Sequence, residues 1–251
     1  MDSCVEIIAH RGSAHLAPEN TLAAFQLGWQ ETTICELDVR QTADGKLVVI
    51  HDDSTRRTTG VDLKVAEQSL SELQQLDAGS GKGEQWRGEK VPSLEEVIAA
   101  MPADKKLLVE IKVGPEIMPE LVRVIRTSRK EKQLILQSFF PWVCTEVKKA
   151  FPHLPVYLLV ACNQDAQTEV WSPTIYQVIM EARKNELDGI SANDTPVIDA
   201  SAVQAVHAAR LRLNIWTVDQ MEEARRLDGL GVDGIITNRP GWLRSQLGQA
   251  A

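Results

Sequence analysis

The stretch RLNIWTVDQMEEARRLDGLGVDGIITN, residues 212–238, carries a complete strand–helix–strand pattern. Apolar, strand-like runs at 212–218 and 232–238 flank a segment at 219–231 whose pattern is typical of a helix. Two strands joined through a helix lie parallel in one sheet, and the connection between them is right-handed. This unit therefore predicts a parallel α/β architecture for its part of the chain.

The same alternation continues outward from this unit through the rest of the chain. Strand-like runs stand at 5–9, 34–42, 106–113, 133–139, 154–160 and 187–193. Helical patterns stand at 18–30, 93–101, 115–130, 141–151, 172–185, 199–210 and 240–248. Eight strand–helix units in 251 residues are typical of a closed (β/α)₈ TIM barrel. A doubly wound open sheet is the structural alternative.

One segment breaks the rhythm, at approximately 52–92, after the second strand region. It is far longer than a usual connection between a strand and a helix. Leu70, Leu73 and Leu76 recur at helical spacing within it, which favours a small ordered cap. No linker-like composition divides the chain, so a single catalytic domain over residues 1–251 is predicted, with the cap as an insertion.

Composition excludes several classes of function. The formal net charge is −8 and basic residues form no cluster, which argues against nucleic-acid binding. No apolar run approaches the roughly 20 residues of a membrane span, and the N-terminus lacks a signal-peptide pattern, so a cytoplasmic protein without stable membrane insertion is expected. The four cysteines show no CxxC spacing and are predicted to be reduced, buried thiols.

Acidic side chains occur at alternate positions of two predicted strands. Residues two apart in a strand point to the same side, so Glu36 and Asp38 share one face, as do Glu110 and Lys112. Three carboxylates that converge among apolar neighbours are stabilised if they share a divalent cation, and all-oxygen ligation suits Mg²⁺ or Ca²⁺. The alternative is a set of ordinary ion pairs with Lys112 and Arg40.

Two histidines follow predicted strands directly. His10 ends the first strand and His51 ends the run KLVVIH, where both could act as general acid and general base near neutral pH. Arg11 can direct two donors onto the oxygens of a phosphate. This arrangement predicts acid/base chemistry on an anionic substrate.

The PENT motif at 18–21 resembles the start of a helix, with a polar cap and a proline ahead of an apolar helical stripe. Asn20 and Thr21 are therefore predicted to act as capping residues. Glu19, within the motif, and Trp216, at the end of another strand, are predicted to line the substrate pocket.

Together these stretches resemble the glycerophosphodiester phosphodiesterase family. The family's motifs occur in the family's order, over essentially the whole chain, as AHRG, PENT, ELDVRQTADGKLVVIHDDSTRRTTG, LVEIK, LQSF, WTVD and DGIITNRP. The resemblance implies a (β/α)₈ barrel with an inserted cap and one divalent metal ion, Mg²⁺ or Ca²⁺. It also implies that His10 and His51 form the acid/base pair. Three carboxylates, Glu36, Asp38 and Glu110, would be the metal ligands. Arg11 and Lys112 would bind the phosphate.

The implied activity is metal-dependent hydrolysis of glycerophosphodiesters to sn-glycerol 3-phosphate and an alcohol such as choline or ethanolamine. The glycerol 2-hydroxyl is a candidate nucleophile, which would give a cyclic phosphate that water then opens. Of the two histidines, His10 is favoured as the base and His51 as the acid. The expected partner is therefore a small-molecule substrate.

Two alternatives differ in the class of function. A phospholipase D-like lyase acting on lysophospholipid or sphingomyelin headgroups shares a related barrel, but it lacks the long insertion and is secreted. A non-catalytic barrel that binds a phosphorylated metabolite would be expected to have lost a site residue, and none is lost here. The preferred headgroup, Mg²⁺ against Ca²⁺, and assembly into a homo-oligomer stay open.

Overall fold

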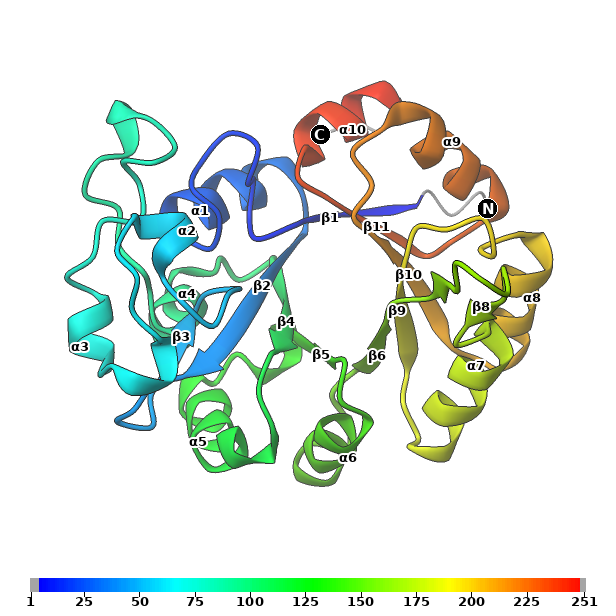
Figure 1. Ribbon diagram of the computed structural model, residues 1–251, viewed down its shortest axis with the longest axis horizontal. Helices are drawn as coiled ribbons and strands as arrows, with labels where there is room; N and C mark the ends of the chain where they lie inside the picture. The colour runs from blue at the N-terminus through cyan, green and yellow to red at the C-terminus, as the bar shows by residue number, and fades with distance from the viewer. Residues whose placement is uncertain (1–4, 249–251) are drawn as a thin grey trace.

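The computed structural model describes residues 5–248, and its strands form a closed barrel (Figure 1). The main sheet has nine strands in the order β1-β11-β10-β9-β6-β5-β4-β2-β3, and β1 also pairs with β2. Among the described residues β3 is the one antiparallel member of this sheet, so eight parallel strands close the ring. These are β1 Glu6–Ala9, β2 Ile34–Gln41, β4 Lys106–Ile111, β5 Leu134–Ser138, β6 Val156–Val160, β9 Gly189–Asn193, β10 Arg212–Trp216 and β11 Gly234–Thr237. The predicted (β/α)₈ barrel is confirmed, and the open sheet is not adopted.

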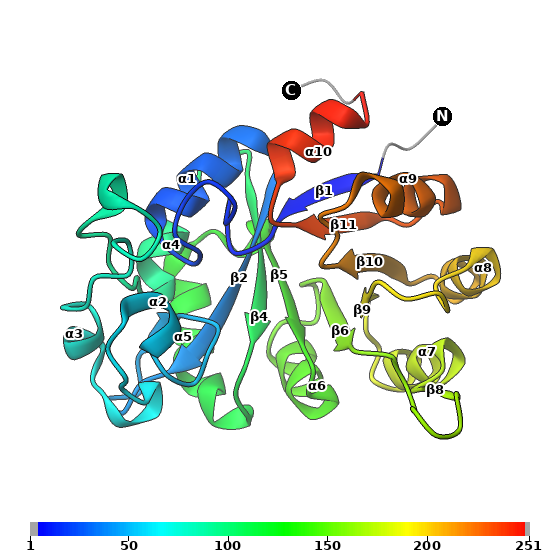
Figure 2. The same ribbon diagram turned by 45° about the horizontal axis from the view of Figure 1, so that its top comes forward.

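Helices surround the barrel on its outside (Figures 1 and 2). They are α1 Leu22–Glu31, α4 Leu94–Ala100, α5 Met118–Ser128, α6 Pro141–Ala150, α7 Ile175–Lys184, α8 Ala200–Ala208, α9 Met221–Leu230 and α10 Pro240–Gln246. The largest apolar cluster fills the layer between these helices and the strands. The outward faces of the strands are thus covered, as a parallel sheet requires.

Alternation along β2 explains how carboxylates enter the barrel. Cys35, Leu37 and Val39 belong to the outer apolar layer. Ile34 instead belongs to a smaller cluster that fills the barrel interior, with residues from five other strands. Glu36 lies two residues beyond Ile34 and therefore on the same side of the strand. Glu36 thus lies next to the interior apolar cluster, on the side of the carboxyl ends of the strands.

The segment between β2 and α4 forms a cap beside the barrel. It contains β3 Leu47–Val49, α2 Arg56–Thr59, α3 Leu70–Leu73 and two 3₁₀ turns at Val65–Glu67 and Glu84–Trp86. Leu73 is buried in a separate apolar cluster of this region, and Leu70 and Leu76 pack against that cluster. The spacing of these three leucines thus corresponds to an ordered core within the insertion.

Smaller elements complete the described chain. A two-stranded hairpin, β7 Asn163–Gln164 and β8 Trp171–Ser172, lies between β6 and α7, and 3₁₀ turns at Pro115–Ile117 and Glu131–Gln133 flank α5. Cys35, Cys144 and Cys162 are free and buried, while Cys4 lies outside the described residues. Within 5–248, none of the helices combines the length and the apolar character needed to span a bilayer.

Candidate active site

A cavity of about 200 Å³ opens at the carboxyl ends of the barrel strands. The predicted site residues all line it except Asp38, which is buried, and Glu19, which lines a smaller neighbouring pocket. Active sites of TIM barrels lie at this face, because the loops after the strands meet there. The barrel has therefore brought together side chains that are spread over more than 200 positions of the sequence.

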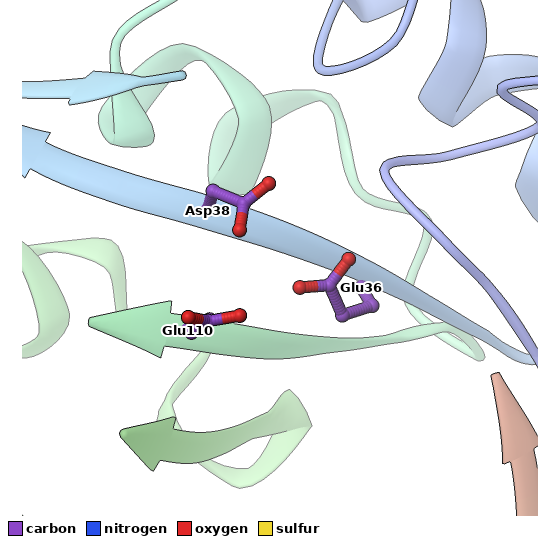
Figure 3. A group of neighbouring side chains, drawn as sticks. All are labelled: Glu36, Asp38 and Glu110. Atoms are coloured by element: carbon purple, nitrogen blue, oxygen red, sulfur yellow. The ribbon is translucent and has the colours of Figure 1, made fainter. Parts of the chain in front are cut away.

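The three predicted metal ligands form one acidic group. Glu36 and Asp38 come from β2 and Glu110 from the neighbouring strand β4 (Figure 3). Each offers an oxygen atom, and these atoms all lie within 4.8 Å of one another. Asp38 and Glu110 are direct partners in the parallel ladder, which explains why their side chains meet. The group could hold a metal ion, and its purely oxygen donor set is the kind that Mg²⁺ and Ca²⁺ accept.

Mutual repulsion and burial act on these carboxylates. Burial raises the pKa of Glu36 well above its usual range, and the charges of Asp38 and Glu110 add to the effect. Burial, followed by the charge of Asp38, raises the pKa of Glu110 to about 7. Such crowding of like charges is unfavourable without a cation among them. The electrostatics of the three side chains therefore also fit a bound divalent ion.

Two basic side chains approach the acidic group. Lys112 Nζ lies 2.5 Å from Glu110 Oε1 and 3.0 Å from Asp38 Oδ1, and Arg11 Nε lies 3.2 Å from Asp38 Oδ2. Burial opposes ionisation of Asp38, but Lys112 and Arg11 outweigh it and lower the pKa of Asp38 to about 2. Glu36 instead accepts a hydrogen bond from the backbone N–H of Arg11, at 3.0 Å. The ion-pair alternative is realised for Lys112, whereas Arg40 Nε–H donates to the carbonyl of His51.

His10 is held in one orientation by Asn238, which follows the last strand, β11. Its Nδ1–H donates to Oδ1 of Asn238 at 2.8 Å, because an amide oxygen can only accept. Asn238 Nδ2–H in turn donates to Asp219, at 2.7 Å. Nε2 of His10 therefore carries the lone pair, and it lies 4.0 Å from Glu36 Oε2. Burial, with a further contribution from Arg11, lowers the pKa of His10 to about 4, which favours the neutral ring.

His51 follows a strand, as the sequence predicts, but that strand is not one of the eight parallel strands of the barrel. It follows β3, which pairs antiparallel with the outer end of β2, so His51 is not at the carboxyl end of a barrel strand. The chain runs past the mouth on β2 and returns on β3. His51 Nδ1–H donates to Asp52 Oδ1 at 2.6 Å, so Nε2 is the ring nitrogen that can take up or release a proton. Burial lowers the pKa of His51 as well.

The PENT motif has two roles, of which only one is capping. Thr21 caps α1 as predicted, since its side chain accepts a hydrogen bond from the backbone N–H of Ala24. The prediction of a capping role is wrong for Asn20, whose Nδ2–H donates to Asp38 Oδ2 at 2.8 Å. Asn20 has φ 58, a left-handed conformation that asparagine adopts more readily than most residues. This backbone turn directs the amide into the acidic group.

Gly12 shapes the loop that carries His10 and Arg11. Its φ is +78, and a Cβ at this position would lie 2.5 Å from the carbonyl carbon of Ala24 in α1. The absent side chain lets the loop pack against α1. Gly12 is thus required by the packing of the loop against α1.

An apolar wall closes one side of the cavity. Trp216 lines the cavity there, and Phe139 meets it edge to face with ring centroids 5.9 Å apart. Trp216 Nε1–H donates to the carbonyl of Ser191, which fixes the indole. Gln137 also lines the cavity; it is 2% exposed, and its Oε1 has no hydrogen-bond partner among the described residues.

Several residues around the site were not identified from the sequence. Their signal is weak because each is a common polar residue whose type alone does not set it apart from its neighbours in the quoted motifs: Asn20, Asp52, Arg57, Gln137, Asp219 and Asn238. A partial signal exists for Asp219, which directly follows one predicted strand run, and for Asn238, which ends another, because barrel loops begin there. The pairing of one with the other depends on tertiary contact.

Known sequences resemble this chain over most of its length. The sequence model of the glycerophosphoryl diester phosphodiesterase family matches residues 10–242. A glycerophosphodiester phosphodiesterase of Caldanaerobacter subterraneus subsp. tengcongensis is 38% identical over 241 residues, covering 93% of this chain and 94% of that protein.

Solved structures resemble the chain over almost its whole length. An Oleispira antarctica phosphodiesterase, in complex with the product sn-glycerol-3-phosphate, has a TM-score of 0.88 and 28% identity, covering 98% of each chain. A glycerophosphodiester phosphodiesterase from Agrobacterium tumefaciens has a TM-score of 0.78 and 25% identity, covering 96% of this chain and 99% of that one. With the family match over residues 10–242, these likenesses mean that the chain belongs to the glycerophosphoryl diester phosphodiesterase family and is a phosphodiesterase.

Proposed function

We propose that this protein hydrolyses glycerophosphodiesters to sn-glycerol 3-phosphate and an alcohol, with one divalent metal ion, as a single catalytic domain over the whole chain. The observation that carries the proposal is one cavity lined by two histidines, each bonded through Nδ1, and by carboxylates of the acidic group. The family and the product bound to the Oleispira relative support the same substrate class.

The metal ion would be held by Glu36, Asp38 and Glu110, and either Mg²⁺ or Ca²⁺ suits their oxygens. When bound, it supplies positive charge close to the substrate phosphate. Arg11 and Lys112 would bind the phosphoryl oxygens and stabilise the charge that develops on them in the transition state. Both side chains line the cavity.

The two histidines would move the protons. Nε2 of His10, which bears the lone pair, takes the proton from the attacking hydroxyl, that of water or of the glycerol 2-position. The new phosphorus–oxygen bond forms as the bond to the leaving alcohol breaks, and His51 in its protonated form gives that alkoxide a proton. If the glycerol hydroxyl attacks, water opens the cyclic phosphate in a second step.

The alcohol would lie against the apolar wall. Phe139, Trp216 and Leu159 contribute this surface, and the Gln137 amide offers one polar contact for a substrate hydroxyl. Glu19 would act beside the pocket, because its carboxylate pairs with Arg11. The partner is thus a small phosphodiester.

A panel of glycerophosphodiesters, assayed by glycerol 3-phosphate release with each metal after chelation, tests the proposal. His10→Ala and His51→Ala should fold normally, judged by circular dichroism and thermal unfolding, and should lose almost all turnover. Full activity of His51→Ala after metal removal would refute the mechanism. A cyclic phosphate as the final product would instead indicate the lyase, and tight binding without turnover in any divalent metal would indicate a binding protein.

A further inference from the structure

The cap carries an arginine that contacts two carboxylates at the rim of the cavity. Arg57 lies in α2, and its Nη1 and Nη2 donate to Glu19 Oε2 and Oε1 at 2.7 and 2.8 Å. Its Nε–H donates to Asp52 Oδ2 at 2.6 Å. The fork of one guanidinium is thus shared between two acidic side chains that come from different loops. Such two-pronged contacts restrict geometry more than a point charge does.

Each of these carboxylates holds a different residue of the proposed site. Oε1 of Glu19 accepts from Arg11 Nη1 at 2.8 Å, and Oδ1 of Asp52 accepts from His51 Nδ1 at 2.6 Å. The guanidinium of Arg57 therefore stands one carboxylate away from both the proposed phosphate-binding arginine and the proposed acid. No shorter route between Arg11 and His51 through side-chain hydrogen bonds is present among the described residues.

We propose that Arg57 is a positioning residue, through which the cap sets the orientation of Arg11 and His51 together. The proposal rests on the proposed function for the roles of those two residues. Without the guanidinium, Glu19 is released to bind Arg11 alone, and Asp52 loses the contact that directs its second oxygen at His51. The imidazole then turns more freely about its Cβ–Cγ bond, and Nε2 spends less time facing the cavity.

The Arg57 side chain lies outside the apolar cluster of the cap. None of the four residues of α2 is buried, and the apolar cluster of the cap is built elsewhere, from residues such as Val65 and Leu73. Removal of the Arg57 side chain should therefore leave the cap folded. Its neighbour Arg56 provides a matched control, because it lies in the same short helix, is 76% exposed and, among the described residues, has its ion pair with Asp62, at 3.6 Å.

Steady-state kinetics on Arg57→Ala and Arg56→Ala test the proposal. Arg57→Ala should lower kcat by about 10- to 100-fold, the usual loss when a group that orients an active-site residue is removed. Arg56→Ala should keep both wild-type constants. In an Asp52→Asn background the same Arg57→Ala change should cost less than in the wild type, because the two residues act through one contact. Guanidinium ion at tens of millimolar should restore part of the turnover of Arg57→Ala, and sodium chloride at equal ionic strength should not.

A second measurement does not require activity. The Nδ1–H proton of His51, bonded to Asp52, should give a low-field proton resonance that Asp52→Asn abolishes and Arg57→Ala shifts or broadens, while Arg56→Ala leaves it unchanged. An unaltered resonance together with unaltered kcat in Arg57→Ala would overturn the proposal. A wild-type protein without turnover on any glycerophosphodiester would instead refute the proposed function, and the resonance would still decide whether Arg57 positions His51.

Discussion

Nδ1 of His10 lies 2.8 Å from Oδ1 of Asn238, although 228 positions separate the two residues in the chain. The contact exists because β1, which precedes His10, pairs with β11, which precedes Asn238. It fixes which nitrogen of the ring carries the proton, and so which one can accept a proton from substrate. The closure of the barrel thus determines the chemistry that His10 can perform.

Asn238→Ala should lower kcat by about 10- to 100-fold with a small change in KM, because the His10 ring loses its orienting acceptor. The measurement is steady-state kinetics on the best substrate of the panel. Asn163→Ala, in the exposed hairpin after β6, is the matched control and should leave kcat unchanged. Equal kcat for both variants would show that Asn238 does not orient the base.

Chelation should abolish turnover, and re-addition of Mg²⁺ or Ca²⁺ should restore it. Binding of the ion to the folded state alone should also raise the free energy of unfolding, by about 2.7 kcal/mol when the free ion is at 100 times its Kd. Glu110→Gln should weaken the binding measured by calorimetry, since it removes one carboxylate of the acidic group. The exposed Glu116→Gln serves as control, and equal affinities in the two variants would exclude Glu110 as a ligand.

Gln137→Leu should affect the free energy of unfolding and KM differently. The unpartnered amide oxygen is buried at a cost, so an apolar side chain of similar size should leave the free energy of unfolding unchanged or raise it by about 1 kcal/mol. KM should rise if the amide contacts the substrate. Denaturant titration and kinetics on the same preparation give both quantities, and an unchanged KM would show that substrate does not use this amide.

Gly12→Ala should destabilise the protein by at least about 2 kcal/mol, because a positive φ is combined with a clash of the new Cβ against Ala24. Gly60→Ala measures the cost of the positive φ without a clash. Gly60 has φ +76 with nothing within 4 Å of the added carbon, so it should cost only about 1 kcal/mol. Urea titrations compare the two, and similar losses would mean that the loop can move away from α1.

Alkaline pH should destabilise the fold through Tyr157 in the barrel interior. Burial raises the pKa of Tyr157 to about 12, above its usual value near 10. Between these values the unfolded chain loses the proton more readily than the folded one, so stability is fully present below pH 10 and falls as pH rises toward 12. Tyr157→Phe should show a smaller drop in Tm between pH 9 and 11 than the wild type. Tyr176→Phe, at an exposed tyrosine, should match the wild type, and equal slopes for all three proteins would contradict this account.

Strand periodicity alone placed the carboxylates. Glu36 and Asp38 share one side of β2 because side chains alternate across a strand, a rule that operates within a few residues of sequence. The order of strands and helices, and thereby the barrel, followed from the same local rules. The ordered motifs added the identity of the family.

These local rules do not predict which segments pair when they are distant in the sequence. KLVVIH has the pattern of a strand, but its antiparallel return along β2 depends on which strand it contacts. Asn20 has the composition of a cap, yet a left-handed turn directs it to Asp38, 18 positions away.

The sequence by itself determined the fold class, the family and the residues that gather at the mouth, because period, turn chemistry and motif order are properties of the local chain. Only the tertiary structure decided how those residues are oriented. The links from His10 to Asn238 and from Arg57 through Asp52 to His51 arise where the closed sheet and the cap meet the mouth. Hydrogen bonds act over about 3 Å in space, and distance along the chain does not report that separation.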